Sequence, residues 1–190
     1  MTITPTALPE VLLIQPNKFE DKRGWFMESF RKDLLEKAVG HAIHFCQDNQ
    51  AQSTHGVIRG LHYQMPPHDQ SKLVSVLQGK VLDVVVDIRK GSPQFGKHLA
   101  VELSSENQKQ LFIPRGFAHG YACLSETTLL AYKVDHYYNK ASEASIAFDD
   151  PQLAIDWQIP NQLQKLSPKD LQHPTFEAAR HFDFNTPSYD

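Results

Sequence analysis

The sequence has little cysteine and almost no excess of charge, and each shortage narrows what the protein can be. Two cysteines, Cys46 and Cys123, occur in the 190 residues, and both lie in strand-like apolar surroundings. In a chain without a secretion signal we expect two reduced, buried thiols rather than a disulfide. The formal net charge of -3 gives no reason to expect a nucleic acid as partner. It is compatible with a local basic pocket, because a small anionic ligand needs only a few cations.

Long hydrophobic runs and internal repeats are also missing. No apolar stretch approaches the length of a membrane span, so we expect no membrane association. The N-terminal segment "MTITPTALPEVLLIQP" lacks the basic region and long apolar run of a signal peptide, which indicates a cytoplasmic protein. No repeat and no low-complexity linker interrupts the chain. A length of 190 residues suits one domain with a sizeable core, and we expect a single domain over 1–190.

What the sequence does contain is a series of short β-branched or alternating runs separated by turn signals such as "GSPQFG" and "SSEN". Eight runs predict strands, over 44–53, 56–64, 72–78, 80–88, 96–104, 109–114, 116–125 and 127–138. So many strands at close spacing predict a mainly β protein, an antiparallel sandwich or small barrel of jelly-roll type with its core at about 40–150.

Helical signals are few. The segment "SFRKDLLEKAVG" places Phe30, Leu34, Leu35 and Ala38 at helical spacing and ends at Gly40, which predicts one helix with a glycine C-cap. After residue 151 the alternation is lost, and we expect a short helical stretch and a loosely held tail at about 160–190. Docking of this tail through Phe182 and Phe184 is the alternative.

Two polar side chains share a strand face with apolar residues. Strict alternation places Lys72 with Val74 and Val76, and Tyr132 with its apolar neighbours two residues away. A lysine on an apolar face is costly unless an anion accompanies it. Singly, each residue has an ordinary structural explanation: lysine is common at strand edges, and tyrosine has high β-propensity.

Arg59 and His62 raise a similar question in "GVIRGLHYQ". They would point to opposite faces of an ideal strand. Gly60 stands between them and is a position where a bulge would re-aim one of the two side chains. The sequence leaves both arrangements open.

The segment "IPRGFAHGY" resembles the second motif of the cupins, with Pro114, Gly116 and His119 at the spacing P-x-G-x-x-H. The first cupin motif would supply H-x-H, but here His62 is followed by Tyr63. Because a transition-metal site needs three or more converging ligands, the resemblance implies a cupin-like double-stranded β-helix without a metal and with a few short peripheral helices. Acid–base chemistry is then the alternative to metal chemistry.

Seven segments in order resemble the dTDP-4-dehydrorhamnose 3,5-epimerases of L-rhamnose biosynthesis over nearly the whole chain. They are 21–30, 46–53, 56–64, 70–96, 111–121, 132–139 and 166–170. The resemblance implies an enzyme that needs no metal or other cofactor and is usually a homodimer. The implied substrate is dTDP-4-keto-6-deoxy-D-glucose, which such enzymes epimerise at C3 and C5.

Residue by residue, the resemblance makes His62 the general base, Asp170 its partner, Tyr132 the proton donor and Lys72 the cation near the keto oxygen. Both C3 and C5 flank the C4 ketone, so removing either proton gives an enolate with its charge on O4, and a histidine has a suitable pKa for the base. The positions that contact the sugar nucleotide in the family correspond to Arg23, Phe26, Glu28, Gln47, Asn49, Arg59, His119, Tyr138, Glu143 and Lys169.

Three alternatives stay open on the sequence. A metal-dependent cupin enzyme would require ligands that the sequence does not display. A sugar-nucleotide-binding module without catalysis would not need the base, its carboxylate and the tyrosine together. An epimerase that acts at C3 only or at C5 only would use the same residues, and the sequence does not separate it from a 3,5-epimerase.

Overall fold

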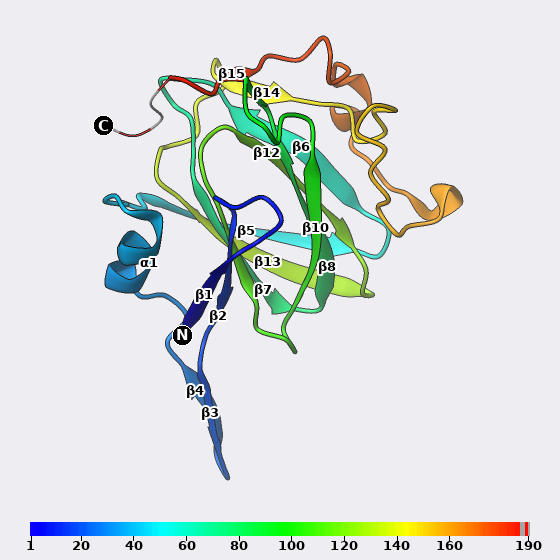
Figure 1. The fold of residues 1–190 in the computed structure, drawn as a ribbon. Coiled ribbons are helices and arrows are strands. Elements are labelled where there is room, and N and C mark those ends of the chain that lie inside the picture. Colours follow the sequence, from blue (N-terminus) through cyan, green and yellow to red (C-terminus); the bar gives the residue numbers. More distant parts are fainter. Residues whose placement is uncertain (187–188, 190) are drawn as a thin grey trace.

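The computed structural model describes residues 1–186 and residue 189, and its strands form two antiparallel sheets that lie face to face (Figure 1). The six-stranded sheet has the order β1 (Thr2–Pro5), β2 (Leu12–Gln15), β11 (Gln110–Ile113), β7 (Lys72–Gln78), β13 (Thr127–Val134) and β5 (Gln47–Thr54). The five-stranded sheet has the order β10 (His98–Ser104), β8 (Lys80–Asp87), β12 (Phe117–Cys123), β6 (Ile58–Gln64) and β14 (Glu143–Ser145). This is the cupin-like jelly roll that the sequence predicts.

All eight predicted strands are confirmed, with ends that differ by a few residues. The alternation does not single out β1 and β2, which pair with each other and add to the six-stranded sheet beside β11. Two short pairs lie outside the main sheets: the hairpin β3 (Lys18–Asp21) with β4 (Gly24–Met27), and β9 (Arg89–Lys90) with β15 (Phe182–Asp183).

The core between the sheets is built from alternate residues of the facing strands. Val81 and Val85 of β8 join Val74 and Val76 of β7 in one buried cluster. The intervening residues of β8, such as Val84, belong to a second cluster on the outer face of the five-stranded sheet, where the C-terminal segment packs with Phe176 and other apolar residues. A strand buried on both faces explains the almost continuous apolar run in this part of the sequence.

Helix α1 (Lys32–Val39) covers the outer face of the six-stranded sheet through Leu35, which packs near Leu73 and Phe112. Its C-cap is Gly40, as predicted, with φ 82° and a backbone N–H that donates to the carbonyl of Glu36. The C-terminal region, where a short helical stretch is predicted, has two single 3-10 turns, η1 (Asn161–Leu163) and η2 (Asp170–Gln172). No helix within 1–186 combines the length and the apolar character that crossing a membrane requires.

The cysteine and tail expectations are partly wrong. Both thiols are free, and Cys123 is buried, but Cys46 is exposed because it shares the outward phase of β5 with Asp48. In the tail, Phe182 is buried and pairs with Arg89, so this part is docked rather than loose. Residues 187, 188 and 190 lie outside the described residues.

The hairpin β3–β4 projects from the body of the molecule (Figure 1). Three of its aromatic side chains are more than half exposed: Phe19 by 60%, Trp25 by 53% and Phe26 by 66%. A two-stranded hairpin with this much exposed apolar surface has little to stabilise it alone.

Candidate active site

A bulge in β6 decides where Arg59 and His62 point. His62 stands opposite His119 of β12 and Arg59 stands opposite Tyr121, so two residues of β6 face a single residue of β12 between these pairs. Gly60 lies in the bulge with φ 138°, and a Cβ there would be 2.5 Å from the β12 backbone. The extra residue shifts the alternation of side chains by one position, so that residues 59 and 62 point to the same face of the sheet. Arg59 and His62 therefore both face the space between the sheets.

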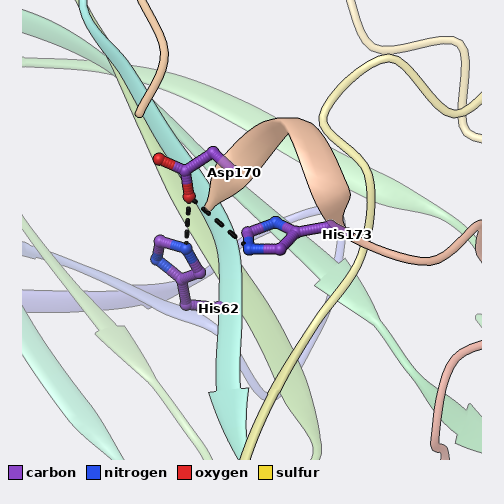
Figure 2. Close-up of side chains that lie close together, drawn as sticks. All are labelled: His62, Asp170 and His173. Atoms are coloured by element: carbon purple, nitrogen blue, oxygen red, sulfur yellow. Dashed lines mark hydrogen bonds and ion pairs between the residues drawn. The ribbon is translucent and has the colours of Figure 1, made fainter. Parts of the chain in front are cut away.

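Figure 2 shows the side chains of His62 and Asp170 pointing toward each other. Nε2 of His62 lies 2.7 Å from Oδ1 of Asp170, which stands 108 residues later in turn η2. Ser167 fixes the carboxylate: its hydroxyl donates to Oδ2 at 2.7 Å and accepts the N–H of Asp170 at 3.1 Å. Because a carboxylate only accepts hydrogen bonds, Nε2 is the donor, and Nδ1 of the neutral ring carries the lone pair.

The pKa of Asp170 reflects this environment. Burial by itself raises it, but the hydrogen bonds from His62 and Ser167 outweigh burial and lower the pKa to about 2. The carboxylate is thus ionised near neutral pH, where it orients the imidazole of His62 and stabilises its protonated form.

His173 is a third side chain at this point. Its Nε2 lies 3.7 Å from Oδ1 of Asp170, and its ring meets the ring of His62 edge-on, with centroids 5.2 Å apart (Figure 2). Burial lowers the pKa of His173, so the ring is neutral at physiological pH.

A second histidine–aspartate pair lies beside the first. Nε2 of His119 is 3.0 Å from both carboxylate oxygens of Asp83, a fully buried residue of β8. Burial lowers the pKa of His119, while the charge of Asp83 acts in the opposite direction.

Lys72 is buried beside both pairs and faces the interior with Val74 and Val76, as predicted. Its ammonium donates to the backbone carbonyl of His62 at 3.2 Å. Burial lowers the pKa of Lys72 to about 8, and the carboxylate of Asp83 limits the fall. The nearby charge of Asp83 thus partly offsets the cost of burying a lysine on an apolar face.

Tyr132 and Arg59 approach the interior from different sheets. Tyr132, on β13, packs against the cluster between the sheets, also as predicted. Burial raises its pKa, Tyr121 raises it further, and the guanidinium of Arg59 opposes the rise. Arg59 donates to the hydroxyl of Ser53 at 3.2 Å and to the carbonyl of Gln52 at 3.3 Å. These two bonds hold the guanidinium against β5.

Five further residues that the resemblance selects form two polar groups. Gln47 and Asn49 share the inner phase of β5, and the amide of Gln47 donates to Asn49 at 2.8 Å. Glu143 accepts from Lys169 at 2.6 Å and from the hydroxyl of Tyr138 at 3.2 Å. The two groups are linked, because the backbone N–H of Tyr138 donates to the side chain of Gln47.

Three selected residues are not brought to this site within the chain. Arg23 belongs to the projecting hairpin and bonds to Asp21. Phe26 is on the same hairpin, and Glu28 follows it and pairs with Arg31 at 3.6 Å. None of the contacts of these residues reaches His62 or its neighbours in the described part of the chain.

Three residues that contact the predicted ones were not selected from the sequence: Asp83, Ser167 and His173. A signal for Asp83 exists, since a charged residue inside "VLDVVVD" needs a buried partner. Ser167 stands three residues before Asp170, a spacing typical of side-chain bonds to a turn. Nothing in the local sequence marks His173.

Comparisons with known proteins identify the family. The family model described as dTDP-4-dehydrorhamnose 3,5-epimerase matches residues 5–178. The dTDP-4-dehydrorhamnose 3,5-epimerase of Shigella flexneri is 47% identical over 182 residues, 96% of this chain and 99% of the relative. The crystal structure of dTDP-6-deoxy-D-glucose-3,5-epimerase RmlC from Legionella pneumophila, in complex with dTDP-4-keto-L-rhamnose, has a TM-score of 0.92 at 45% identity and covers 97% of this chain and 99% of that one.

A more distant similarity is to ChmJ, a 3'-monoepimerase from Streptomyces bikiniensis solved with dTDP-quinovose. Its TM-score is 0.85 at 33% identity, over 92% of this chain and 87% of that one. The cupin-like fold and these similarities define the class of protein, a sugar-nucleotide epimerase. The chain belongs to the dTDP-4-dehydrorhamnose 3,5-epimerase family, which confirms the resemblance seen in its sequence.

Proposed function

We propose that the protein converts dTDP-4-dehydro-6-deoxy-D-glucose to dTDP-4-dehydro-L-rhamnose by inverting C3 and C5 without a metal or other cofactor. One observation carries the mechanism. His62 lies on β6 of the five-stranded sheet and Tyr132 on β13 of the six-stranded sheet, and both face the interior. A sugar ring held between the sheets has a base on one face and an acid on the other.

Proton removal is the first step at each carbon. Nδ1 of His62 takes the proton, and the electron pair of the C–H bond forms an enolate whose charge lies on O4. Asp170 holds Nε2–H and stabilises the imidazolium that results. No electron carrier is needed, since the adjacent ketone acidifies both C–H bonds.

Lys72 stabilises the enolate. Its ammonium is buried, and a cation placed where charge develops in a site that excludes water acts more strongly than the same cation in solvent. Asp83 behind it keeps more of the lysine protonated than burial alone would allow.

Tyr132 returns a proton from its hydroxyl to the opposite face of the same carbon, which completes the inversion. Arg59 binds the diphosphate, for which a planar guanidinium fork is suited. We assign contacts with the rest of the sugar nucleotide to Gln47, Asn49, His119, Tyr138, Glu143 and Lys169.

A homodimer is part of this proposal. The aromatic side chains of the β3–β4 hairpin are exposed in the single chain, and a second copy would bury them. Arg23, Phe26 and Glu28 lie on or next to that hairpin, so a sugar-nucleotide contact by these residues is made most simply across the dimer interface. We place the reaction in the cytoplasm, with other sugar-nucleotide metabolism.

Inversion of C3 alone is the second candidate, and the similarity to ChmJ favours including it. Both reactions require the same base and the same acid. They differ in whether the ring, once inverted at one carbon, presents the other to His62.

Proton NMR of the 4-keto sugar nucleotide in deuterium oxide tests the proposal. We expect solvent deuterium at both C3 and C5 and a product inverted at both. Deuterium at C3 alone would favour the monoepimerase, and no deuterium at either carbon would contradict both candidates.

Tyr132→Phe tests the two-faced arrangement. The phenyl ring keeps the packing, and proton removal by His62 does not need the hydroxyl. The variant should still incorporate deuterium with retention while inversion slows by about 10²-fold or more. Equal loss of exchange and inversion would show that the hydroxyl acts during proton removal and would contradict the donor role.

A further inference from the structure

Three side chains of types that bind metals, one of them the proposed base His62, converge at one point. His62, Asp170 and His173 each offer one ligand atom, and these atoms lie within 4.8 Å of one another. Two of the separations are shorter, 2.7 Å and 3.7 Å from Oδ1 of Asp170 to Nε2 of His62 and Nε2 of His173. Figure 2 shows both rings directed at the same carboxylate oxygen.

The surroundings of His173 do not explain its polar ring. Its side chain is 4% exposed, and both ring nitrogens are buried without a hydrogen bond of good geometry. The backbone of Ile146 is near enough only to act weakly against the effect of burial on the pKa of the ring. A buried polar group left unpaired is costly. His119 differs, because it is equally buried but has both oxygens of Asp83 within 3.0 Å.

We propose that His62, Asp170 and His173 form a site for a divalent transition metal such as Zn²⁺, and that the metal inhibits the enzyme reversibly. The inhibition rests on the proposed function, because it assumes that His62 is the base. The site itself rests only on the geometry.

The donor set fits zinc. Two imidazoles and one carboxylate are common protein ligands of Zn²⁺, with bonds of about 2.0–2.2 Å and a fourth position left for water. Ligand atoms around a tetrahedral ion at such distances are roughly 3.3 Å apart. The observed 2.7 Å and 3.7 Å lie on either side of this spacing. The two imidazole nitrogens, within 4.8 Å of each other, would have to approach by up to about 1.5 Å, which side-chain rotation can supply.

Metal binding would remove the base by changing its tautomer. In the metal-free site Nε2 of His62 holds the proton and Nδ1 the lone pair. A metal on Nε2 needs the lone pair there, so the proton of the neutral ring moves to Nδ1, the atom that should accept the substrate proton. The ring remains neutral overall and can no longer act as a base. Turnover should therefore fall while dTDP still binds.

Titration calorimetry of the untagged protein with Zn²⁺ alone tests the site without any activity measurement. His173→Leu fills the buried space with an apolar side chain and removes one ligand. We expect this variant to bind zinc at least about tenfold more weakly than the wild type. His98→Gln is the matched control, because it removes an exposed histidine at the far edge of the five-stranded sheet. A second variant, His173→Gln, guards against misfolding of the first, and circular dichroism checks both.

Inhibition is measured on the same proteins, each relative to its own metal-free rate. Wild type and His98→Gln should lose turnover in Zn²⁺ and recover it with EDTA, with dTDP affinity unchanged, and both His173 variants should need at least about tenfold more zinc. Equal zinc affinity in wild type and folded His173 variants would overturn the site. Binding that depends on His173 but leaves turnover intact would overturn the inhibition and count against His62 as the base. Activity lost when EDTA is added to the wild type as purified, before any zinc, would overturn the proposed cofactor-free reaction instead.

Discussion

His62 and His119 lie on neighbouring strands, and each is hydrogen-bonded to an aspartate, but water reaches the two pairs very differently. In the outer pair the side chain of His62 is 35% exposed and that of Asp170 is 7% exposed. In the inner pair the corresponding values are 8% for His119 and 0% for Asp83. The two histidines stand directly opposite each other in the β6–β12 ladder, so the same residue types occupy two environments a few ångströms apart.

An aspartate partner alone does not suit a histidine to act as a base, because the ring must also be accessible to a substrate. His62 has one nitrogen bound and the other free toward accessible space, which a group that exchanges protons with a substrate needs. His119 uses one nitrogen on both oxygens of a carboxylate that also balances a buried ammonium. In the proposed mechanism the outer pair carries out proton transfer, and the charge of Asp83 in the inner pair favours the protonated form of Lys72.

We expect the largest difference between the two pairs when each histidine is replaced in turn. His62→Asn removes the base, and we expect exchange of the C3 and C5 protons with solvent deuterium to fall by about 10⁴-fold. His119→Asn leaves the base in place and should slow exchange by less than about 10²-fold. Deuterium NMR of the substrate measures both. Equal losses in the two variants would mean that the pairs do not have separate roles.

The carboxylates should differ in the same direction. Asp170→Asn leaves an amide that does not stabilise the imidazolium, so turnover should drop by about a thousandfold with dTDP binding nearly intact. Kinetics and calorimetry with dTDP separate the two effects. A fall in dTDP affinity that matches the fall in turnover would make Asp170 a ligand contact instead.

Asp83 should matter for stability. Asp83→Ala leaves the ammonium of Lys72 and the ring of His119 buried without their anion, and breaking such a buried pair costs about 3 kcal/mol. Urea unfolding measures it against Asp170→Ala, whose partner His62 is partly exposed and should be less affected. A change within experimental error for Asp83→Ala would show that Lys72 has another counter-charge.

The smallest effect should appear in the pH profile. Burial lowers the pKa of Lys72 to about 8, so the ammonium is lost as pH rises through that value and turnover should fall on the alkaline side. Asp83→Asn removes the opposing charge and should move the alkaline limb to lower pH, whereas Asp170→Asn should leave it in place. A limb at the same pH in Asp83→Asn would assign it to another group.

The same pKa has a consequence for stability with a defined sign. The pKa of Lys72 is about 8 in the folded protein and about 10.4 for an unperturbed lysine, so the unfolded chain binds more protons between these values. Stability contributed by this group should therefore rise with pH in that window. Lys72→Met should remove the rise, which urea unfolding at several pH values would detect.

Local patterns predicted much of the fold. Alternation identified eight strands and placed Lys72 and Tyr132 on the inner face, because side chains in a strand alternate whatever the strand pairs with. Gly40 marked the end of the one α-helix correctly. The same rule failed for Cys46, since its strand begins one residue later and the sequence does not show which phase faces outward.

Short-range patterns in the sequence predict the strands, the family and the residue types of the proposed site. Which of these residues meet depends on the tertiary structure. Asp170 reaches His62 from 108 positions away, and His173 arrives with it because both belong to one turn. The bulge at Gly60 turns Arg59 and His62 to one face, while Arg23 and Phe26 lie on the β3–β4 hairpin and Glu28 directly follows it. Such contacts depend on the register between strands and on how distant segments pack, and neither is written in the short-range periodicity of the chain.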